Sequence, residues 1–296
     1  MPWLWFLLGV AGFATLVVLS LGKRHAQVRF IRELLANDDQ PAPARRVIAA
    51  ISTLPDRIAN LEATISCLLD QTRPPDEIIL ALPQFSIRQQ KAYAIPNYLQ
   101  AFANLRVLHC EKDWGPATKF IPVVQEELAA SRGDTLIWVM DDDRTYPPDA
   151  LETFVHYNRQ LPDGALCFRG AAIRRHAKKS ALEIFRGSEI RTPKPIAVIT
   201  GCGSYLIQPR FFDARLWDYS AAPEAAFYMD DIWISGWLDR RGVPKYLIPT
   251  SAMMRSVRRQ SRTMSLHDVP NGRLQNNKDV IAFFRDTWTV FSEHSK

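Results

Sequence analysis

Residues 135–143 read Thr-Leu-Ile-Trp-Val-Met-Asp-Asp-Asp, an apolar stretch that ends in three consecutive carboxylates. A short apolar run of this kind is typical of a buried strand. Adjacent aspartates repel one another, so we expect a cation to neutralise them. Oxygen ligands suit Mg²⁺ or Mn²⁺, which take further ligands from water and substrate phosphates. The three aspartates are therefore predicted to bind a metal ion, and the plain alternative is a solvated acidic turn that caps the next helix.

Strands and helices alternate on both sides of this stretch. Apolar runs predict buried strands at residues 47–51, 77–82, 105–110, 135–140, 165–169, 198–207 and 246–248. Gly201 and Gly203 interrupt the strand expected at residues 198–207. Helical spacing predicts helices at residues 58–69, 116–130, 148–160 and 225–241. The alternation indicates an α/β fold with a mostly parallel sheet flanked by helices. Ligands bind such sheets beyond the carboxyl ends of the strands, where the three aspartates lie.

The N-terminus predicts a membrane anchor. Residues 3–21 carry no charge, and this run is long enough to form one transmembrane helix. A cleaved signal peptide is the alternative, but the basic residues follow the apolar run and do not precede it. These residues, Lys23, Arg24, Arg29 and Arg32, favour a cytoplasmic catalytic domain. We expect a protein of the bacterial inner membrane, and the absence of any N-x-[ST] sequon agrees with a domain outside the secretory lumen.

The chain divides into four predicted parts. Residues 1–22 form the anchor, 23–45 a juxtamembrane linker, 46–270 the catalytic domain and 271–296 a C-terminal amphipathic segment. The net charge of +6 suits a partner that carries phosphates. The four cysteines form no C-x-x-C pair, so neither a zinc knuckle nor a dense disulfide framework is indicated.

Two known families share the acidic pattern. Asp141-x-Asp143-x-Thr145 resembles the opening motif of haloacid-dehalogenase-like phosphatases, in which the first aspartate is a nucleophile and the second a general acid. That motif normally follows the first strand of its domain, whereas three strand-helix units precede it here. Arg144 also takes the place of the usual glycine.

The second resemblance covers more of the chain. From Arg46 to His267 the sequence is similar to family 2-like glycosyltransferases of the GT-A (Rossmann-like) fold, in the nucleotide-diphospho-sugar transferase superfamily. The similarity is carried by Ile48-Ala-Ala-Ile-Ser-Thr-Leu-Pro-Asp-Arg57, by the D-x-D motif at Asp141 to Asp143, and by Met229-Asp230-Asp231-Ile232-Trp233.

This resemblance implies roles for the acidic residues. Asp141 and Asp143 would hold Mn²⁺ or Mg²⁺, with Asp142 beside the nucleotide, and the ion would stabilise the charge of the leaving diphosphate. Asp231 would be the catalytic base that takes the proton of the acceptor hydroxyl, and Asp230 would bind the acceptor or sugar. A pair of helix-capping aspartates is the alternative for these last two.

Further residues are expected around the donor. Ser52, Thr53 and Arg57 would face the base and ribose, with a plain helix cap as the alternative. Lys119, expected in the first turn of a helix, would bind phosphate, or else be an ordinary solvated lysine. A C-terminal segment would close over the diphosphate, with His267 as a third metal ligand, or would instead touch anionic lipid. The basic residues that precede His267 are Arg255, Arg258, Arg259 and Arg262.

The sequence thus predicts a metal-dependent, inverting glycosyltransferase. It would move one sugar from a nucleoside-diphosphate sugar to a hydroxyl of a glycan or lipid-linked acceptor, in polysaccharide biosynthesis, with no nucleic-acid partner. The chain lacks the Q-x-x-R-W motif of processive synthases, which favours transfer of a single sugar. The alternatives are the phosphatase and a catalytically inactive sugar-nucleotide-binding scaffold.

Overall fold

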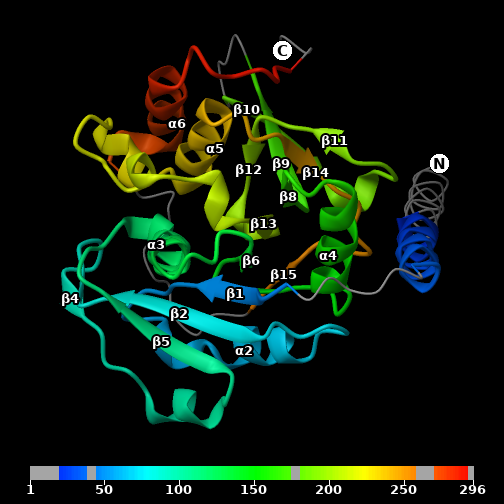
Figure 1. Cartoon of the computed structure of the whole chain (residues 1–296), viewed down its shortest axis with the longest axis horizontal. Coiled ribbons are helices and arrows are strands. Elements are labelled where there is room, and N and C mark those ends of the chain that lie inside the picture. The colour runs from blue at the N-terminus through cyan, green and yellow to red at the C-terminus, as the bar shows by residue number, and fades with distance from the viewer. Residues whose placement is uncertain (1–19, 39–44, 175–180, 258–269, 293–296) are drawn as a thin grey trace, which may run out of the picture.

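An eight-stranded sheet organises the computed structural model of the protein (Figure 1). The structure describes residues 20–38, 45–174, 181–257 and 270–292. Across the sheet the strands lie in the order β11 (Lys194–Pro195), β14 (Lys245–Leu247), β8 (Ala165–Cys167), β13 (Tyr205–Ile207), β6 (Leu136–Val139), β1 (Val47–Ile51), β2 (Glu77–Pro83) and β5 (Leu105–Cys110). The predicted α/β class is confirmed.

The pairing of the strands determines which loops meet. Strands β6, β1, β2 and β5 run parallel to one another, so their carboxyl ends share one edge. Strand β13 runs antiparallel to β6, with Tyr205 opposite Val139. The chain that leads into β13 therefore lies beside the aspartates that follow β6. This antiparallel strand lies between β6 and β8 in the sheet.

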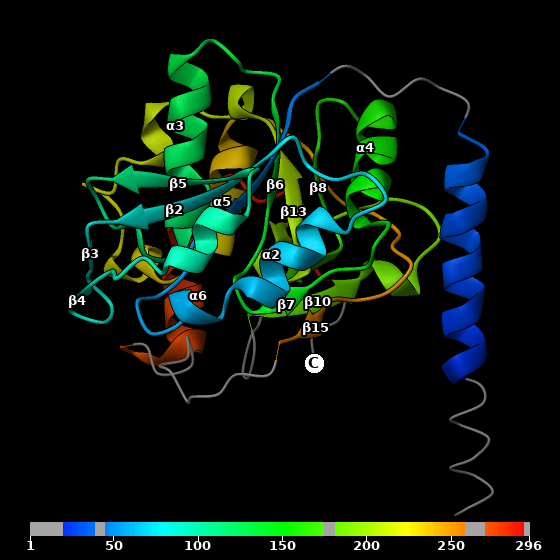
Figure 2. The ribbon, with the colours of Figure 1, turned by 90° about the horizontal axis from the view of Figure 1, so that it is seen from below.

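The alternation of side chains in β1 shows how both faces of the sheet are covered. Val47, Ala49 and Ile51 belong to one apolar cluster, and Ile48 and Ala50 belong to the other. Helices α2 (Glu62–Leu69) and α4 (Ala150–Gln160) cover the first face, and α2 is seen in front of the sheet in Figure 2. Helices α3 (Ile121–Ala129), α5 (Asp230–Arg240) and α6 (Gly272–Phe283) cover the second face.

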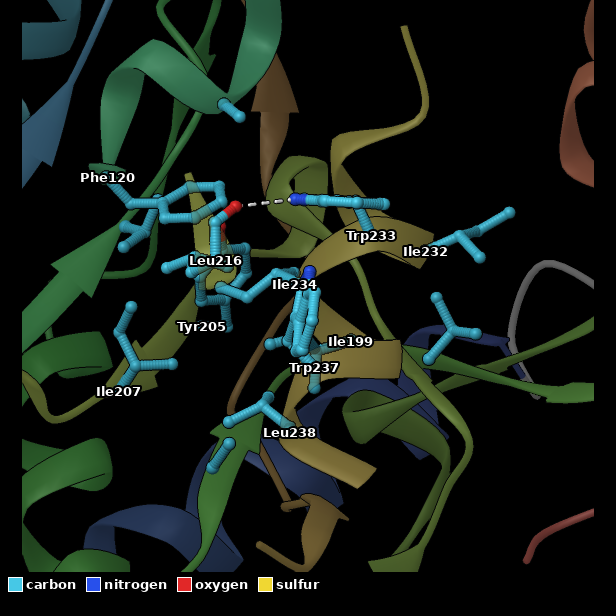
Figure 3. Packing of buried hydrophobic residues seen from close by; sticks show 14 of the residues in the cluster. Phe120, Ile199, Tyr205, Ile207, Leu216, Ile232, Trp233, Ile234, Trp237 and Leu238 are labelled. Atoms are coloured by element: carbon cyan, nitrogen blue, oxygen red, sulfur yellow. Dashed lines mark hydrogen bonds between the residues drawn. The ribbon is translucent and has the colours of Figure 1, made fainter. Parts of the chain in front are cut away.

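Helix α5 is held by aromatic packing (Figure 3). The Trp233 side chain is fully buried, and its Nε1–H donates to the carbonyl of Leu216 at 2.8 Å. Its ring lies 5.4 Å from that of Phe284, centroid to centroid. A Cβ placed on Gly236 would lie 2.3 Å from the Phe284 ring, so only glycine permits this close approach. The first turn of α5, which carries Asp230 and Asp231, is therefore fixed to the core.

Several predicted elements differ in detail from the structure. The predicted strand 165–169 is two strands, β8 and β9 (Arg169–Ile173), which belong to different sheets. The predicted strand 198–207 is β12 (Val198–Ile199) and β13, separated by a 3₁₀ turn over Gly201–Gly203. Strands β10 (Leu182–Arg186), β9 and β12 form a three-stranded sheet. Two-stranded ribbons join β7 (Arg144–Thr145) to β15 (Arg255–Ser256) and β3 (Phe85–Ser86) to β4 (Lys91–Ala92).

Three of the predicted helices begin with a 3₁₀ turn that precedes the α-helix. These turns are η1 (Ile58–Asn60) before α2, η3 (Gly115–Lys119) before α3 and η8 (Glu224–Phe227) before α5. Lys119 is therefore the last residue of a 3₁₀ turn and does not lie in the first turn of an α-helix, as the sequence had suggested. Other short 3₁₀ turns are η2 (Asn97–Ala101), η4 (Gly187–Glu189), η6 (Pro209–Phe211) and η7 (Ala214–Leu216).

The N-terminal helix, residues 20–36, packs against the catalytic domain (Figure 2). The Gln27 amide donates to the carbonyls of Ile190 at 3.1 Å and Thr250 at 3.0 Å, and Ile31 is fully buried. Much of the expected linker is thus a docked helix. In the described part of the chain no helix is long and apolar enough to cross a bilayer. Most of the predicted anchor, residues 1–19, lies outside the described residues.

Candidate active site

The three aspartates that follow β6 line one cavity of about 340 Å³. The same cavity is bordered by the loop after β1, by η3, by the turn before β13 and by the start of α5. Although Asp141, Asp142 and Asp143 are adjacent in sequence, their side chains contact different partners. The cluster therefore divides into three sites with different chemical surroundings.

Asp142 faces the loop that follows β1. Thr53 Oγ1 donates to its Oδ2 at 2.7 Å, and Arg57 Nη1 donates to its Oδ1 at 3.2 Å. Thr64 Oγ1 on α2 donates to the Asp142 carbonyl at 2.9 Å, which connects α2 to the segment that follows β6. Ser52 lines the same part of the cavity. The structure thus brings together Ser52, Thr53 and Arg57, the residues expected around the nucleotide.

Asp141 faces Lys119. The Lys119 Nζ lies 2.9 Å from Asp141 Oδ1 and 2.8 Å from Asp230 Oδ2. Burial alone would lower the pKa of Lys119, but the charges of Asp141 and Asp230 outweigh it and raise this pKa well above its ordinary value. Burial likewise would raise the pKa of Asp141, but the charge of Lys119 and its hydrogen bond keep this pKa below its ordinary value. Lys119 therefore joins the end of β6 to the first turn of α5 through two carboxylates.

Asp231 has a different environment from its neighbour. Its Oδ1 accepts a hydrogen bond from the backbone N–H of Gly201 at 2.8 Å. Burial raises the pKa of the Asp231 carboxyl to about 7, and the charge of Asp230 adds to the effect. A carboxyl that titrates near neutral pH and borders a cavity has the properties of a general base. Asp230 and Asp231 therefore have different partners although they are adjacent in the sequence.

The turn Gly201–Gly203 fits closely against the charged residues. A Cβ on Gly201 would lie 2.5 Å from Lys119 Nζ, and one on Gly203 would lie 2.3 Å from the Arg169 Cβ. The next residue, Ser204, adopts a left-handed conformation with φ of 63°. Crowding by the Arg169 backbone therefore requires glycine at position 203, whereas a Cβ at position 201 would press on the flexible end of the Lys119 side chain. The glycines that interrupt the apolar run in the sequence were the signal of this turn.

The cavity has further lining residues that the sequence pattern did not identify. Arg169 donates to Thr200 Oγ1 at 3.3 Å and to Cys202 Sγ at 3.2 Å, on the side of the cavity that holds Asp231. The other newly identified lining residues are Arg88, Tyr93, Asp113, Cys202 and Arg273. No local motif marks them, because they come from separate loops and from α6.

Asp143 lies at the ribbon formed by β7 and β15. Its carboxylate is 3.3 Å from Arg144 Nε, and its carbonyl accepts the N–H of Val257 at 2.9 Å. Within the described ranges, no group of three or more His, Cys, Asp or Glu side chains could hold a metal ion. Asp141 and Asp143 line the same cavity, and Mg²⁺ commonly binds one or two carboxylates together with substrate phosphates. This donor set fits such an ion when a diphosphate completes the ligands.

Four predicted site residues lie outside the described residues, all in the segment 258–269. They are Arg258, Arg259, Arg262 and His267. Their expected roles, contacts with the diphosphate and a third metal ligand, stay predictions.

Comparison with known proteins identifies the family. Residues 51–209 match the family described as Glycosyl transferase family 2. A solved structure, that of a 4-diphosphocytidyl-2C-methyl-D-erythritol synthase, is 15% identical and aligns over 73% of this chain and 94% of that chain with a TM-score of 0.44. No curated protein sequence matches. The matched range includes the β1 loop, Lys119 and all three aspartates, but ends before Asp230.

Proposed function

The chain belongs to glycosyl transferase family 2, and from this premise we propose that it transfers one sugar from a nucleoside-diphosphate sugar to an acceptor hydroxyl, with Asp231 as the base. The observation that carries the proposal is one cavity that contains both the aspartates after β6 and a carboxyl with a pKa of about 7. The family match does not favour the phosphatase. The acceptor would be a glycan or a lipid-linked sugar.

The donor nucleotide would bind along the loop after β1. Thr53 and Arg57 are already held there by Asp142, so this side of the cavity is ordered before the donor arrives. Preorganised contacts of this kind reduce the entropy lost on binding. Arg57 and Ser52 supply donors that suit the ribose and phosphates.

Transfer would proceed with inversion. The acceptor oxygen forms a bond to the anomeric carbon while the bond from that carbon to the diphosphate oxygen breaks. The acceptor proton passes to Asp231, and the nucleoside diphosphate leaves with the electron pair. Asp231 is ionised in part at neutral pH, as a base must be before it can take the proton.

A divalent ion forms the second part of the proposal. Asp141 and Asp143 would hold Mn²⁺ or Mg²⁺, and the bound ion would supply Lewis-acid stabilisation of the leaving diphosphate. The support is the shared cavity and the hard oxygen donors of both side chains.

One experiment separates the proposed function from its alternatives. The purified protein is titrated with UDP and GDP by calorimetry, and then incubated with UDP-sugars, GDP-sugars and p-nitrophenyl phosphate. A glycosyltransferase binds a nucleoside diphosphate and releases it from the matching sugar nucleotide. Hydrolysis of p-nitrophenyl phosphate without nucleotide preference would support the phosphatase, and binding without any turnover would support the inactive scaffold.

We also propose that residues 1–22 anchor the protein in a membrane with the catalytic domain on the cytoplasmic side. The support is the uncharged run at residues 3–21 and the basic residues that follow it. In spheroplasts of a bacterial host, the catalytic domain should resist added protease and become sensitive after lysis. Digestion of the domain in intact spheroplasts would contradict this orientation.

A further inference from the structure

We propose that Lys119 is a positioning residue that fixes the acidic start of α5 against the donor-binding edge of the sheet, and that it does not bind the donor phosphate. This inference rests on the proposed function, which places the donor near Asp141 and the catalytic base at the start of α5. It assigns Lys119 a role different from the phosphate contact that the sequence suggests.

The first observation is the placement of the lysine side chain. Only 6% of the Lys119 side chain is exposed, and its Nζ lies within 2.9 Å of Asp141 and 2.8 Å of Asp230. The two carboxylates come from different elements, one from the end of β6 and one from the first turn of α5. A buried ammonium between two carboxylates holds both strongly, because each charge would otherwise lose its solvation without compensation.

The second observation is that Gly201 leaves space for this amine. A Cβ at Gly201 would lie 2.5 Å from Lys119 Nζ and 3.1 Å from Asp141 Oδ1. The N–H of the same residue donates to Asp231 at 2.8 Å. The residue that accommodates the lysine therefore also holds the proposed base, so displacement of the amine is transmitted to Asp231.

These contacts explain why the position of the lysine matters to transfer. The base must lie at the correct distance from the leaving group on the other side of the sugar. Displacement of a reacting group by about 1 Å can cost about 100-fold in rate. Lys119 sets this separation because its amine contacts both Asp141, at the donor-binding edge of the sheet, and Asp230, on the helix that carries the proposed base.

The first test removes the lysine together with one of its two carboxylates, so that the double variant keeps the net charge of the wild type. Lys119→Met alone would leave Asp141 and Asp230 as uncompensated buried charges, so it is combined with Asp230→Asn and compared with Asp230→Asn by itself. The readouts are UDP and GDP affinity by calorimetry and hydrogen exchange of the Gly201 amide, which reports on the bond to Asp231. We expect exchange to be about tenfold faster in the double variant, while nucleotide affinity stays within about threefold of that of Asp230→Asn.

The second test moves the amine without any change of charge. Gly201→Ala places a methyl group against Lys119 Nζ, and the matched control Gly22→Ala places one where no atom lies within 4 Å. We expect Gly201→Ala to lower the release of nucleoside diphosphate from the sugar nucleotide by about 100-fold, as a misplaced reacting group predicts. The control should keep wild-type turnover.

The outcomes separate this inference from the proposed function. A fall in UDP and GDP affinity of about tenfold or more in the double variant would show that Lys119 binds phosphate, and unchanged Gly201 exchange would show that it does not position Asp231. Either result overturns the inference. If the wild-type protein binds no nucleoside diphosphate, the proposed function fails, and the exchange measurement still decides whether Lys119 holds Asp231.

Discussion

The carboxylate of Asp231 accepts a hydrogen bond from the backbone N–H of Gly201 at 2.8 Å. This bond joins the first turn of α5 to the turn that precedes β13, two segments 30 residues apart in the chain. Since β13 pairs with β6, the same contact brings the proposed base next to the aspartates that follow β6.

Asp231→Asn should lower turnover by about 10² to 10⁴-fold and leave nucleoside-diphosphate affinity nearly unchanged, because the lost group acts on the acceptor proton in the transition state. In the wild type, kcat/KM should rise with pH through about 7, since the pKa of Asp231 is raised by burial and by the charge of Asp230. Lys119 opposes this shift and Asp141 adds to it.

The control for this prediction is Asp286→Asn, an exposed site whose side chain should not affect turnover. Steady-state kinetics between pH 5 and 9 provide the measurement. If Asp230→Asn were inactive and Asp231→Asn retained wild-type turnover, Asp230 would be the base.

Asp143→Asn should abolish the strengthening of UDP or GDP binding by Mn²⁺. In the wild type we expect the ion to increase affinity by about tenfold or more, which corresponds to about 1.4 kcal/mol. Calorimetric titration with Mn²⁺ and with EDTA measures the difference. Asp163→Asn, at a side chain that is 76% exposed, serves as the control. Equal affinity of Asp143→Asn and wild type in the presence of Mn²⁺ would refute the metal assignment.

Thr53→Val should lower the free energy of unfolding by about 1–3 kcal/mol, because Asp142 is buried and loses a hydrogen-bond donor at 2.7 Å. Thr72→Val removes a similar hydroxyl that donates to Glu152 at an exposed position, and should change stability by less than about 0.5 kcal/mol. Urea denaturation of both variants gives the comparison. Similar losses of unfolding free energy in Thr53→Val and Thr72→Val would mean that the Thr53 hydroxyl does not stabilise the loop after β1.

Gly236→Ala should destabilise the protein by about 1–3 kcal/mol, since the new methyl group would overlap the ring of Phe284. Because this glycine lies on α5, the variant should also loosen the packing of α6. Thermal and urea unfolding of Gly236→Ala and of the control Gly22→Ala test the prediction. An unfolding midpoint equal to that of the control would show that α6 can move away without cost.

Local patterns were sufficient to predict the secondary structure around the site. The apolar run that precedes Asp141 predicted β6, and helical spacing over residues 225–241 predicted α5, although the α-helix itself begins at Asp230. The strand-helix alternation predicted the α/β class, because the spacing of apolar residues within each segment indicates whether it forms a strand or a helix. The interruption at Gly201 and Gly203 was also visible in the sequence, but the function of that turn was not.

The sequence by itself determined the elements and the acidic residues, because hydrophobic periodicity and residue type act over a few neighbouring positions. Only the tertiary structure decided how the charges pair. The antiparallel insertion of β13 placed Gly201 beside Lys119, and the buried amine joined Asp141 to Asp230, which lies 89 residues further along the chain. Such pairing depends on strand order and burial, because a charge that is removed from water must find its partner in space, wherever that partner lies in the sequence.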